Sequence, residues 1–327
     1  MLPAPLQSLR IPVIASPMLI ASYPELVLAQ CKAGVVGAFP ALNARPAARL
    51  ADWLVQIDET LIRYRADHPG ALVGPYAVNQ ICHASNARLE ADMRICLDRR
   101  VPLLITSLRA PPREIVDEIH RYGGVVMHDA TTVRHAQKAI EAGVDGLILV
   151  AAGAGGHAGT LSPFALVGEV RRMFDGCLVL SGAIATGEAI AAALALGADA
   201  AYIGTRFLAS REANVAAQYK QTIVEAQAAD IVYTDAFTGV PGNYLRQSIE
   251  AAGLDPRRLP RAEDAAIDFS GSSDTKQWRD IWGAGQGVGA VDAVLDVEAI
   301  VSQLERELAL ARRRLSPADS LATAQSR

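Results

Sequence analysis

The sequence contains no run of lysine and arginine long enough to follow a phosphate backbone, and its net charge at pH 7 is only −4. Nucleic acid is therefore not an expected partner. No apolar segment approaches the roughly 18 residues that a membrane-spanning helix needs. Even the alanine-rich stretch 189–198 is short and interrupted by glycine. We therefore expect no membrane association.

Cysteine is also scarce, and Cys31, Cys82, Cys96 and Cys177 show neither CxxC spacing nor a pairing pattern. This indicates reduced core thiols in a cytoplasmic protein, with no metal site. The apolar N-terminal stretch has no basic region before it and no clean cleavage site. It is typical of a first strand rather than a signal peptide.

Charged residues make up only 20% of the 327 residues, whereas hydrophobic residues make up 51%. This composition allows a sizeable core and excludes global disorder. The length fits two average domains, or one large α/β barrel with an addition.

Short β-branched segments alternate with amphipathic ones along the first two thirds of the chain. Helices are predicted at 24–34, 48–65, 87–100, 113–123, 132–143, 164–174 and 186–198. Strands are predicted at 12–18, 35–40, 72–79, 102–108, 124–130, 146–152, 177–183 and 201–208. The strands are almost continuously apolar, as strands covered by helices must be. This alternation of strands and helices predicts a (β/α)8 TIM barrel, with an open doubly wound sheet as the alternative.

The regular alternation of strand-like and helix-like segments ends after Phe207. Residues 1–208 are expected to form the barrel, and residues 209–287 an inserted, mostly helical segment around a helix at 214–227. Residues 288–315 read as the returning eighth helix, with a break near Leu295. The small and polar residues 316–327 are expected to be a disordered tail.

Residues 150–160 read VAAGAGGHAGT, and four of the seven positions from 153 to 159 are glycine. Glycine is placed where the backbone takes unusual dihedrals or approaches a ligand closely. His157 is the only side chain there able to move a proton, and it follows the sixth predicted strand, where barrel enzymes place catalytic groups. His128 lies near the end of the fifth predicted strand and His83 follows the third, but hydrogen-bonded structural histidines are the favoured interpretation for both.

The loops after strands seven and eight, SGAIATGEA (181–189) and YIGTRF (202–207), are rich in glycine and small side chains. Such loops in barrels commonly bind phosphate through backbone N–H groups, and Thr186 or Thr205 could add a hydroxyl. Ordinary tight turns are the alternative. Together with the glycine-flanked histidine, the loops predict flavin mononucleotide (FMN) over the barrel mouth, its ring extending toward Asn79 and the loop after the first strand.

Several short segments, in order along the chain, resemble the nitronate monooxygenase family, and more distantly the flavin-dependent enoyl-ACP reductases. The matching segments are ASPM (15–18), Asn79, AGGH (154–157), SGAIATG (181–187), ALALGADAAYIGTRF (193–207) and WGAGQGVG (282–289). The chain departs from the best-studied branch at Val150, at Ala183 and in the segment before Met18. These departures leave the branch and the substrate open.

The resemblance implies that His157 is the catalytic base and that glycine and side-chain contacts hold FMN. It implies FMN contacts at Met18, Asn79, Gly155, Gly182, Ala183, Gly204 and Thr205, with Gln286 near the flavin or the substrate pocket.

The implied reaction is oxidation of alkyl nitronates or nitroalkanes by O2 to carbonyl compounds and nitrite, with His157 removing the α-proton of a neutral nitroalkane. The alternative is an FMN-dependent NAD(P)H reductase of an enoyl thioester or a quinone. A cysteine-dependent dehydrogenase is rejected because residues 150–162 contain no cysteine. A non-enzymatic binding module would leave both the histidine and the phosphate loops without a purpose. The sequence leaves open whether the protein forms a homodimer.

Overall fold

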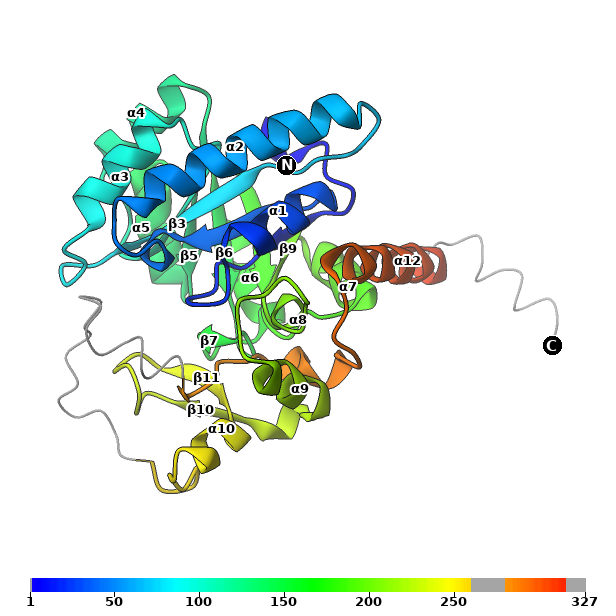
Figure 1. Ribbon diagram of the computed structural model, residues 1–327. Helices are drawn as coiled ribbons and strands as arrows, with labels where there is room; N and C mark the ends of the chain where they lie inside the picture. Colours follow the sequence, from blue (N-terminus) through cyan, green and yellow to red (C-terminus); the bar gives the residue numbers. More distant parts are fainter. Residues whose placement is uncertain (1, 260–279, 316–327) are drawn as a thin grey trace.

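The computed structural model describes residues 2–259 and 280–315. Its main sheet has eight parallel strands in the order β1-β9-β8-β6-β5-β4-β3-β2 (Figure 1). The strands are β1 (Val13–Ala15), β2 (Gly37–Pro40), β3 (Tyr76–Cys82), β4 (Leu103–Leu108), β5 (Val125–Ala130), β6 (Gly146–Val150), β8 (Cys177–Ser181) and β9 (Ala200–Ile203).

The sheet closes on itself between its two edge strands. The amide of Ala15 donates to the Val36 carbonyl at 2.8 Å, and the amide of Val36 donates to the Val13 carbonyl at 3.2 Å. Closure confirms the (β/α)8 TIM barrel and excludes the open doubly wound sheet.

Helices cover the outside of the barrel. They are α1 (Pro24–Lys32), α2 (Arg49–Asp67), α3 (Leu89–Asp98), α4 (Arg113–Arg121), α5 (Val133–Ala142), α6 (Pro163–Arg171), α7 (Gly187–Leu196) and α12 (Val297–Leu315). Thr132 and Thr186 cap α5 and α7 by accepting a backbone N–H three residues on, each at 3.2 Å. The same helices end at Gly143 and Gly197, both in the left-handed conformation that glycine adopts readily.

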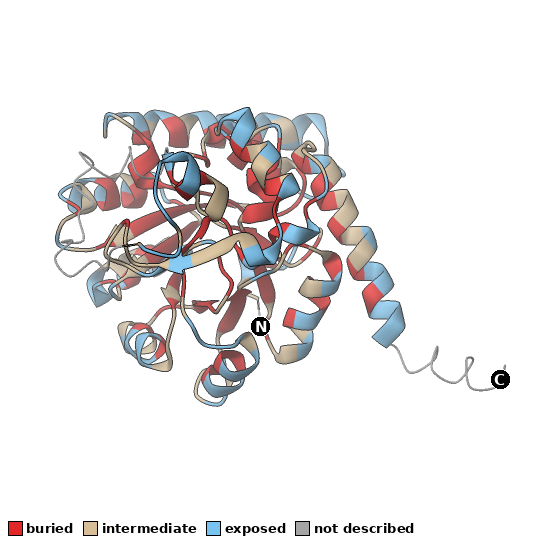
Figure 2. Cartoon of the chain, turned by 90° about the horizontal axis from the view of Figure 1, so that it is seen from below, coloured by how far each residue is buried: buried red, intermediate tan, exposed pale blue. Residues whose placement is uncertain are grey.

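The core has two layers because successive strand residues point to opposite faces. In β4, Leu103 and Ile105 belong to the cluster inside the barrel, whereas Leu104 packs between the sheet and the helices. Figure 2 shows the buried strands ringed by helices that are buried on their inner faces only. All four cysteines are free and buried, and burial raises the pKa of each thiol to about 12.

Several element boundaries differ from the predictions, two of them beside the candidate site or at the last helix. The strand predicted at 201–208 ends at Ile203, because the chain turns at Gly204 into the short helix α8 (Thr205–Leu208). The last helix begins only at Val297 instead of residue 288, and a 3-10 turn, η4 (Gln286–Ala290), takes up the start of that segment. The predicted tail at 316–327 lies outside the described residues.

The insertion, residues 209–287, contains the helices α9 (Ala217–Glu225) and α10 (Arg246–Ala251). It also contains an antiparallel ribbon that the sequence did not predict, made of β10 (Ile231–Thr234) and β11 (Gly242–Leu245). β11 pairs with a third short strand, β7 (Gly156–His157), which follows β6 of the barrel. The insertion is therefore joined by backbone hydrogen bonds to the segment that carries the candidate histidine.

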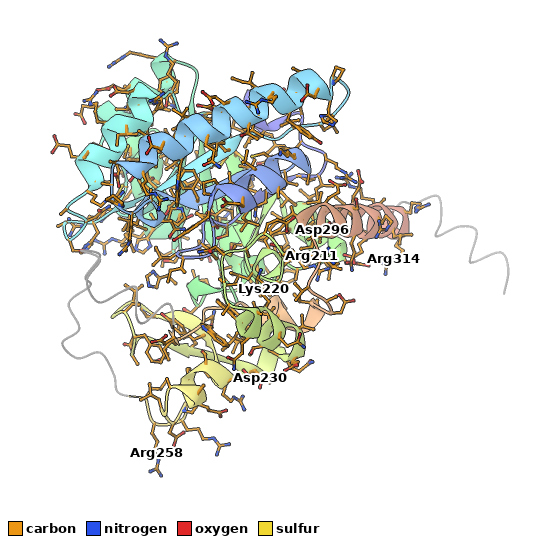
Figure 3. All side chains as sticks on the ribbon, viewed as in Figure 1. Arg211, Lys220, Asp230, Arg258, Asp296 and Arg314 are labelled. Carbon is orange, nitrogen blue, oxygen red and sulfur yellow. The ribbon has the colours of Figure 1, made fainter. Side chains whose placement is uncertain are left out.

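The start of the insertion also contacts the segment before α12. The amide of Arg211 donates to the Leu295 carbonyl at 2.8 Å, and its guanidinium lies 3.8 Å from Asp296 (Figure 3). α12 in turn packs against α7 and α1, in the place of the eighth barrel helix (Figure 1). None of the helices in the described part of the chain is long and apolar enough to cross a membrane.

Candidate active site

A cavity of about 910 Å³ lies at the carboxyl ends of the barrel strands and is covered by the insertion. The predicted base and all predicted FMN contacts except Gln286 line it: Met18, Asn79, Gly155, His157, Gly182, Ala183, Gly204 and Thr205. Thr186, the alternative to Thr205 as a phosphate-binding hydroxyl, lies outside the lining and caps α7. The position agrees with the rule that barrel sites are built from the loops that follow the strands.

The Gln286 side chain is exposed and lies outside the cavity lining. The backbone amide of Gln286 donates to the Gly153 carbonyl at 2.9 Å, which packs η4 behind the loop that follows β6. Gln286 was predicted to contact FMN, but its side chain is not part of the cavity wall.

The glycines of the predicted loops lie against one another. A Cβ on Gly155 would lie 2.7 Å from the amide nitrogen of Gly285, and one on Gly285 would lie 2.7 Å from the Gly153 carbonyl oxygen. A Cβ on Gly182 would lie 2.7 Å from the Ala152 carbonyl oxygen, and its φ of +140° also disfavours a side chain. These contacts explain much of the glycine in residues 153–159, since three loops pack backbone against backbone beneath the cavity.

We expect Gly155→Ala to lower the free energy of unfolding by about 2 kcal/mol, because the new methyl group would overlap backbone atoms that cannot rotate away. Gly168→Ala is the matched control, since a Cβ at this exposed position of α6 meets nothing within 4 Å. The free energy of unfolding of the control should rise by roughly 0.5–1 kcal/mol, because alanine has a higher helix propensity than glycine. Urea unfolding measures both, and equal stabilities for the two variants would contradict the packing argument.

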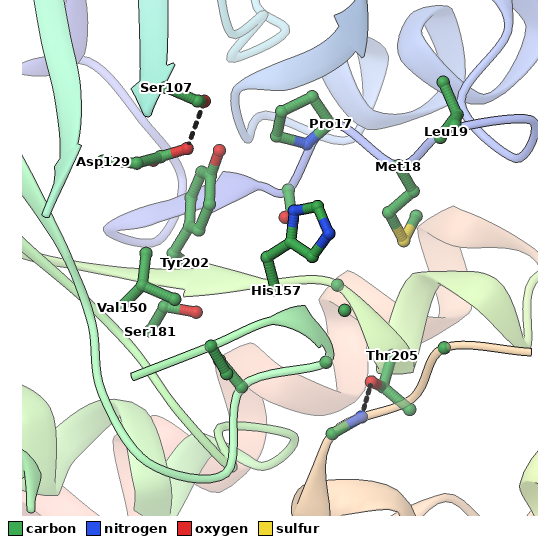
Figure 4. Close-up of a pocket in the computed structure, with 18 of the residues that line it drawn as sticks. Pro17, Met18, Leu19, Ser107, Asp129, Val150, His157, Ser181, Tyr202 and Thr205 are labelled. Carbon is green, nitrogen blue, oxygen red and sulfur yellow. Dashed lines mark hydrogen bonds between the residues drawn. The ribbon is translucent and has the colours of Figure 1, made fainter. Parts of the chain in front are cut away.

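The loops after β1 and β9 are fixed by hydrogen bonds beside the cavity. The Met18 carbonyl accepts from Asn43 Nδ2 at 3.0 Å, and the Met18 amide donates to Ser22 Oγ at 3.0 Å. Thr205 Oγ1 accepts from the Gly285 amide at 2.9 Å (Figure 4). A Cβ on Gly204 would lie only 3.3 Å from the Ser16 Cβ, so this part of the wall holds only a very small residue without rearrangement.

His157 stands in the cavity wall on β7 (Figure 4). The loop that carries it folds back onto the barrel, because the Gly159 amide donates to the Val150 carbonyl at the end of β6 at 3.2 Å. Its Nε2 lies 3.0 Å from Thr238 Oγ1 of the insertion. Burial lowers the pKa of His157 to about 4, so the imidazole is neutral near pH 7 and able to accept a proton.

A polar chain that the sequence analysis missed crosses the ends of β3, β4 and β5. Asn79 Nδ2 donates to Ser107 Oγ at 2.7 Å, and Ser107 Oγ donates to Asp129 Oδ2 at 2.6 Å. The other carboxyl oxygen, Asp129 Oδ1, has no hydrogen-bond partner among the described residues. The Tyr202 hydroxyl points toward this carboxyl group (Figure 4).

Burial raises the pKa of Asp129 to about 7, against the smaller opposing effect of the hydrogen bond from Ser107. The pKa of Tyr202 is also raised, first by burial and then by the negative charge of Asp129. An acidic residue at the carboxyl end of an otherwise apolar predicted strand was the signal that could have located Asp129.

His135, on α5, also lines the cavity. It is exposed, with Nδ1 3.0 Å from Thr131 Oγ1. On the insertion side, the rings of Tyr219 and Trp282 stack with centroids 4.9 Å apart and contribute a flat wall. These residues come from segments whose approach to the barrel has no local signal in the sequence.

His128 and His83 lie outside the cavity lining. His128 Nδ1 lies 2.8 Å from Thr106 Oγ1, and burial lowers its pKa to about 4. His83 Nδ1 lies 2.8 Å from Ser85 Oγ. Both are hydrogen-bonded, in agreement with the favoured structural interpretation.

The residues present fit a flavin. Gly182 and Gly204, which directly follow β8 and β9, line the cavity without a side chain, and the open acceptor of Asp129 suits an N–H group of a ring. Side chains at Met18, Val150 and Trp282 supply apolar surface. No group of three or more potential metal ligands occurs among residues 2–259 and 280–315.

The chain is similar to known proteins over nearly its whole length. A nitronate monooxygenase of Paraburkholderia phytofirmans is 28% identical, and the alignment covers 93% of this chain and 94% of that protein. Among solved structures, nitroalkane oxidase from Streptomyces ansochromogenes has a TM-score of 0.77 and 26% identity, covering 94% of this chain and 98% of that one. FabK from Thermotoga maritima has a TM-score of 0.75 and 26% identity, covering 95% and 96%.

The closed barrel, the cavity at its mouth and these relatives define a flavin-type oxidoreductase. Within that class, the family model for nitronate monooxygenase matches residues 4–307. The chain belongs to the nitronate monooxygenase family.

Proposed function

We propose that the protein oxidises alkyl nitronates, and nitroalkanes after their deprotonation, with O2 on a bound FMN, releasing carbonyl compounds and nitrite. The observation that carries the proposal is a neutral imidazole, His157, in the wall of a flavin-sized cavity. Membership of the nitronate monooxygenase family supports the same reaction.

Eight cavity residues would hold or face the cofactor in this proposal. Gly182, Ala183, Gly204 and Thr205 would hold the phosphate group through backbone N–H groups and the Thr205 hydroxyl. Met18, Asn79, Gly155 and Asp129 would surround the ring. When bound, FMN supplies the electron transfer and the reaction with O2, which no side chain of the protein provides.

His157 acts as the general base toward a neutral nitroalkane. A nitroalkane carries an acidic C–H group, and a neutral imidazole in a buried wall is in the protonation state that removes this proton. The nitronate that results is an anion, and the protonated imidazole beside it would provide the compensating charge. The aromatic wall of Tyr219 and Trp282 helps to exclude water from the reacting groups.

The proposal is tested by absorbance spectroscopy of the purified protein under anaerobic conditions. Propyl nitronate should rapidly bleach the oxidised flavin band, and admission of O2 should restore it with formation of nitrite. NADH and NADPH should leave the band unchanged over the same time. Rapid bleaching by a pyridine nucleotide with no response to nitronate would instead establish the reductase activity, and a protein that does not take up FMN would overturn both.

A further inference from the structure

The hydroxyl of Thr238 has three hydrogen-bond partners, and one of them is the candidate base. Thr238 lies in the turn between β10 and β11, and its Oγ1 is 3.0 Å from His157 Nε2. The hydroxyl donates to the Val240 carbonyl at 3.0 Å, and it accepts from the Val240 amide at 3.3 Å.

A threonine hydroxyl has a single hydrogen to donate and two lone pairs with which to accept. The 3.0 Å contact lets that hydrogen go to the Val240 carbonyl, and the hydroxyl oxygen then accepts from both the Val240 amide and His157. In this arrangement His157 donates from Nε2. A neutral imidazole carries its one proton on one nitrogen only, so the lone pair resides on Nδ1.

We propose that Thr238 is a positioning residue that holds His157 in the Nε2–H tautomer, so that Nδ1 is the atom that takes the substrate proton. The role of Nδ1 as proton acceptor rests on the base role of His157 in the proposed function. The Nε2–H tautomer concerns the resting protein alone and is independent of the reaction.

The insertion places Thr238 beside His157 by contacts on several sides. Gly242 of β11 pairs with His157, and the Ala158 amide donates to the Pro241 carbonyl at 3.2 Å. The Tyr233 hydroxyl of β10 donates to the Ala158 carbonyl at 3.0 Å. The ribbon therefore fixes both the backbone and the ring of the base, and its role extends beyond covering the cavity.

The tautomer is measured directly by NMR on the full-length protein with FMN bound and ¹⁵N-labelled histidine. Long-range ¹H–¹⁵N correlations distinguish a protonated Nε2 from a protonated Nδ1, and His157→Asn identifies the His157 signals among those of the six histidines. We expect the Nε2–H pattern in the wild-type protein at pH 7. An Nδ1–H pattern would overturn the proposal.

Two variants separate the hydroxyl from the shape of the residue. Thr238→Ser keeps the hydroxyl and should keep the Nε2–H pattern. Thr238→Val keeps the shape without an acceptor, and it should show a mixture of tautomers with about a tenfold loss of kcat/KM for a neutral nitroalkane, as loss of one hydrogen bond implies. The rate with preformed nitronate should stay the same in both variants.

The outcomes distinguish this proposal from the proposed function. The Nε2–H pattern in a protein without nitroalkane or nitronate activity would confirm the tautomer and reject the reaction. A nitroalkane rate in Thr238→Val equal to that of the wild type, with an unchanged NMR pattern, would overturn the positioning role while leaving the reaction intact. Should Thr238→Val fail to fold, the wild-type spectrum still decides the tautomer.

Discussion

His157→Asn is expected to lower kcat/KM for a neutral nitroalkane by about 10²–10⁴, the usual contribution of a general base. The same variant should oxidise preformed propyl nitronate within roughly tenfold of the wild-type rate, because that substrate has already lost its proton. Asparagine is polar but does not accept a proton near neutral pH. Nitrite formation with each substrate, at saturating FMN, measures both rates.

His135→Asn is the matched control, since His135 also lines the cavity but is exposed and lies on α5. Its rates with both substrates should stay within about twofold of those of the wild type, as expected for an exposed side chain outside the chemistry. An equal loss with nitroalkane and nitronate in His157→Asn would show that His157 serves binding or electron transfer and not proton removal.

Asp129→Asn is expected to raise the free energy of unfolding of the flavin-free protein above pH 7, by a few kcal/mol and at most about 4 kcal/mol. Burial raises the folded-state pKa of Asp129 to about 7, well above its usual value in an unfolded chain. The folded state therefore binds more protons than the unfolded state between about pH 4 and pH 7, and stability falls as pH rises through that window. Asparagine removes the penalty and still accepts from Ser107.

Urea unfolding at pH 4, 5, 6, 7 and 8 measures the difference between Asp129→Asn and the wild type. It should be smallest at pH 4 and reach its maximum above pH 7. A difference that stays constant with pH would show that Asp129 is not a buried titrating group.

Asp199→Asn provides a control of opposite sign. Burial of Asp199 by itself raises its pKa, but hydrogen bonds from the Leu178 amide and from Arg171 outweigh it and lower the pKa below its usual value. That carboxylate stabilises the fold above its unfolded-state pKa, and the contribution is lost as pH falls through the folded-state pKa. Asp199→Asn should therefore lose stability at pH 8 and approach the wild type in acid.

The barrel could be predicted because its signals are local. Apolar runs such as 102–108 and 146–152 identified β4 and β6, and glycine at 143 and 197 marked the ends of α5 and α7. The ribbon could not be predicted in the same way. β11 begins at Gly242, directly after a proline, and pairs with the two-residue strand β7 far away in the sequence.

The candidate site was likewise predictable only where its signals are local in the sequence. His157 and the glycine loops were visible as unusual composition at the ends of predicted strands, and these residues line the cavity. Asp129 also stood at the end of a predicted strand, but its hydrogen bond from Ser107 could not be predicted. Thr238 and the stacked pair Tyr219 and Trp282 had no such signal, because their roles come from contacts between segments.

The sequence by itself determined the alternation of strands and helices, the positions of the glycine-rich loops and a histidine at the carboxyl end of a strand. These properties depend on side-chain periodicity and backbone preference within a few neighbouring residues. Tertiary structure decided which loops meet, so it kept Gln286 out of the cavity lining and raised the pKa of Asp129 by burial. It also placed Thr238 against His157, since hydrogen bonds and desolvation act between residues that are close in space and distant along the chain.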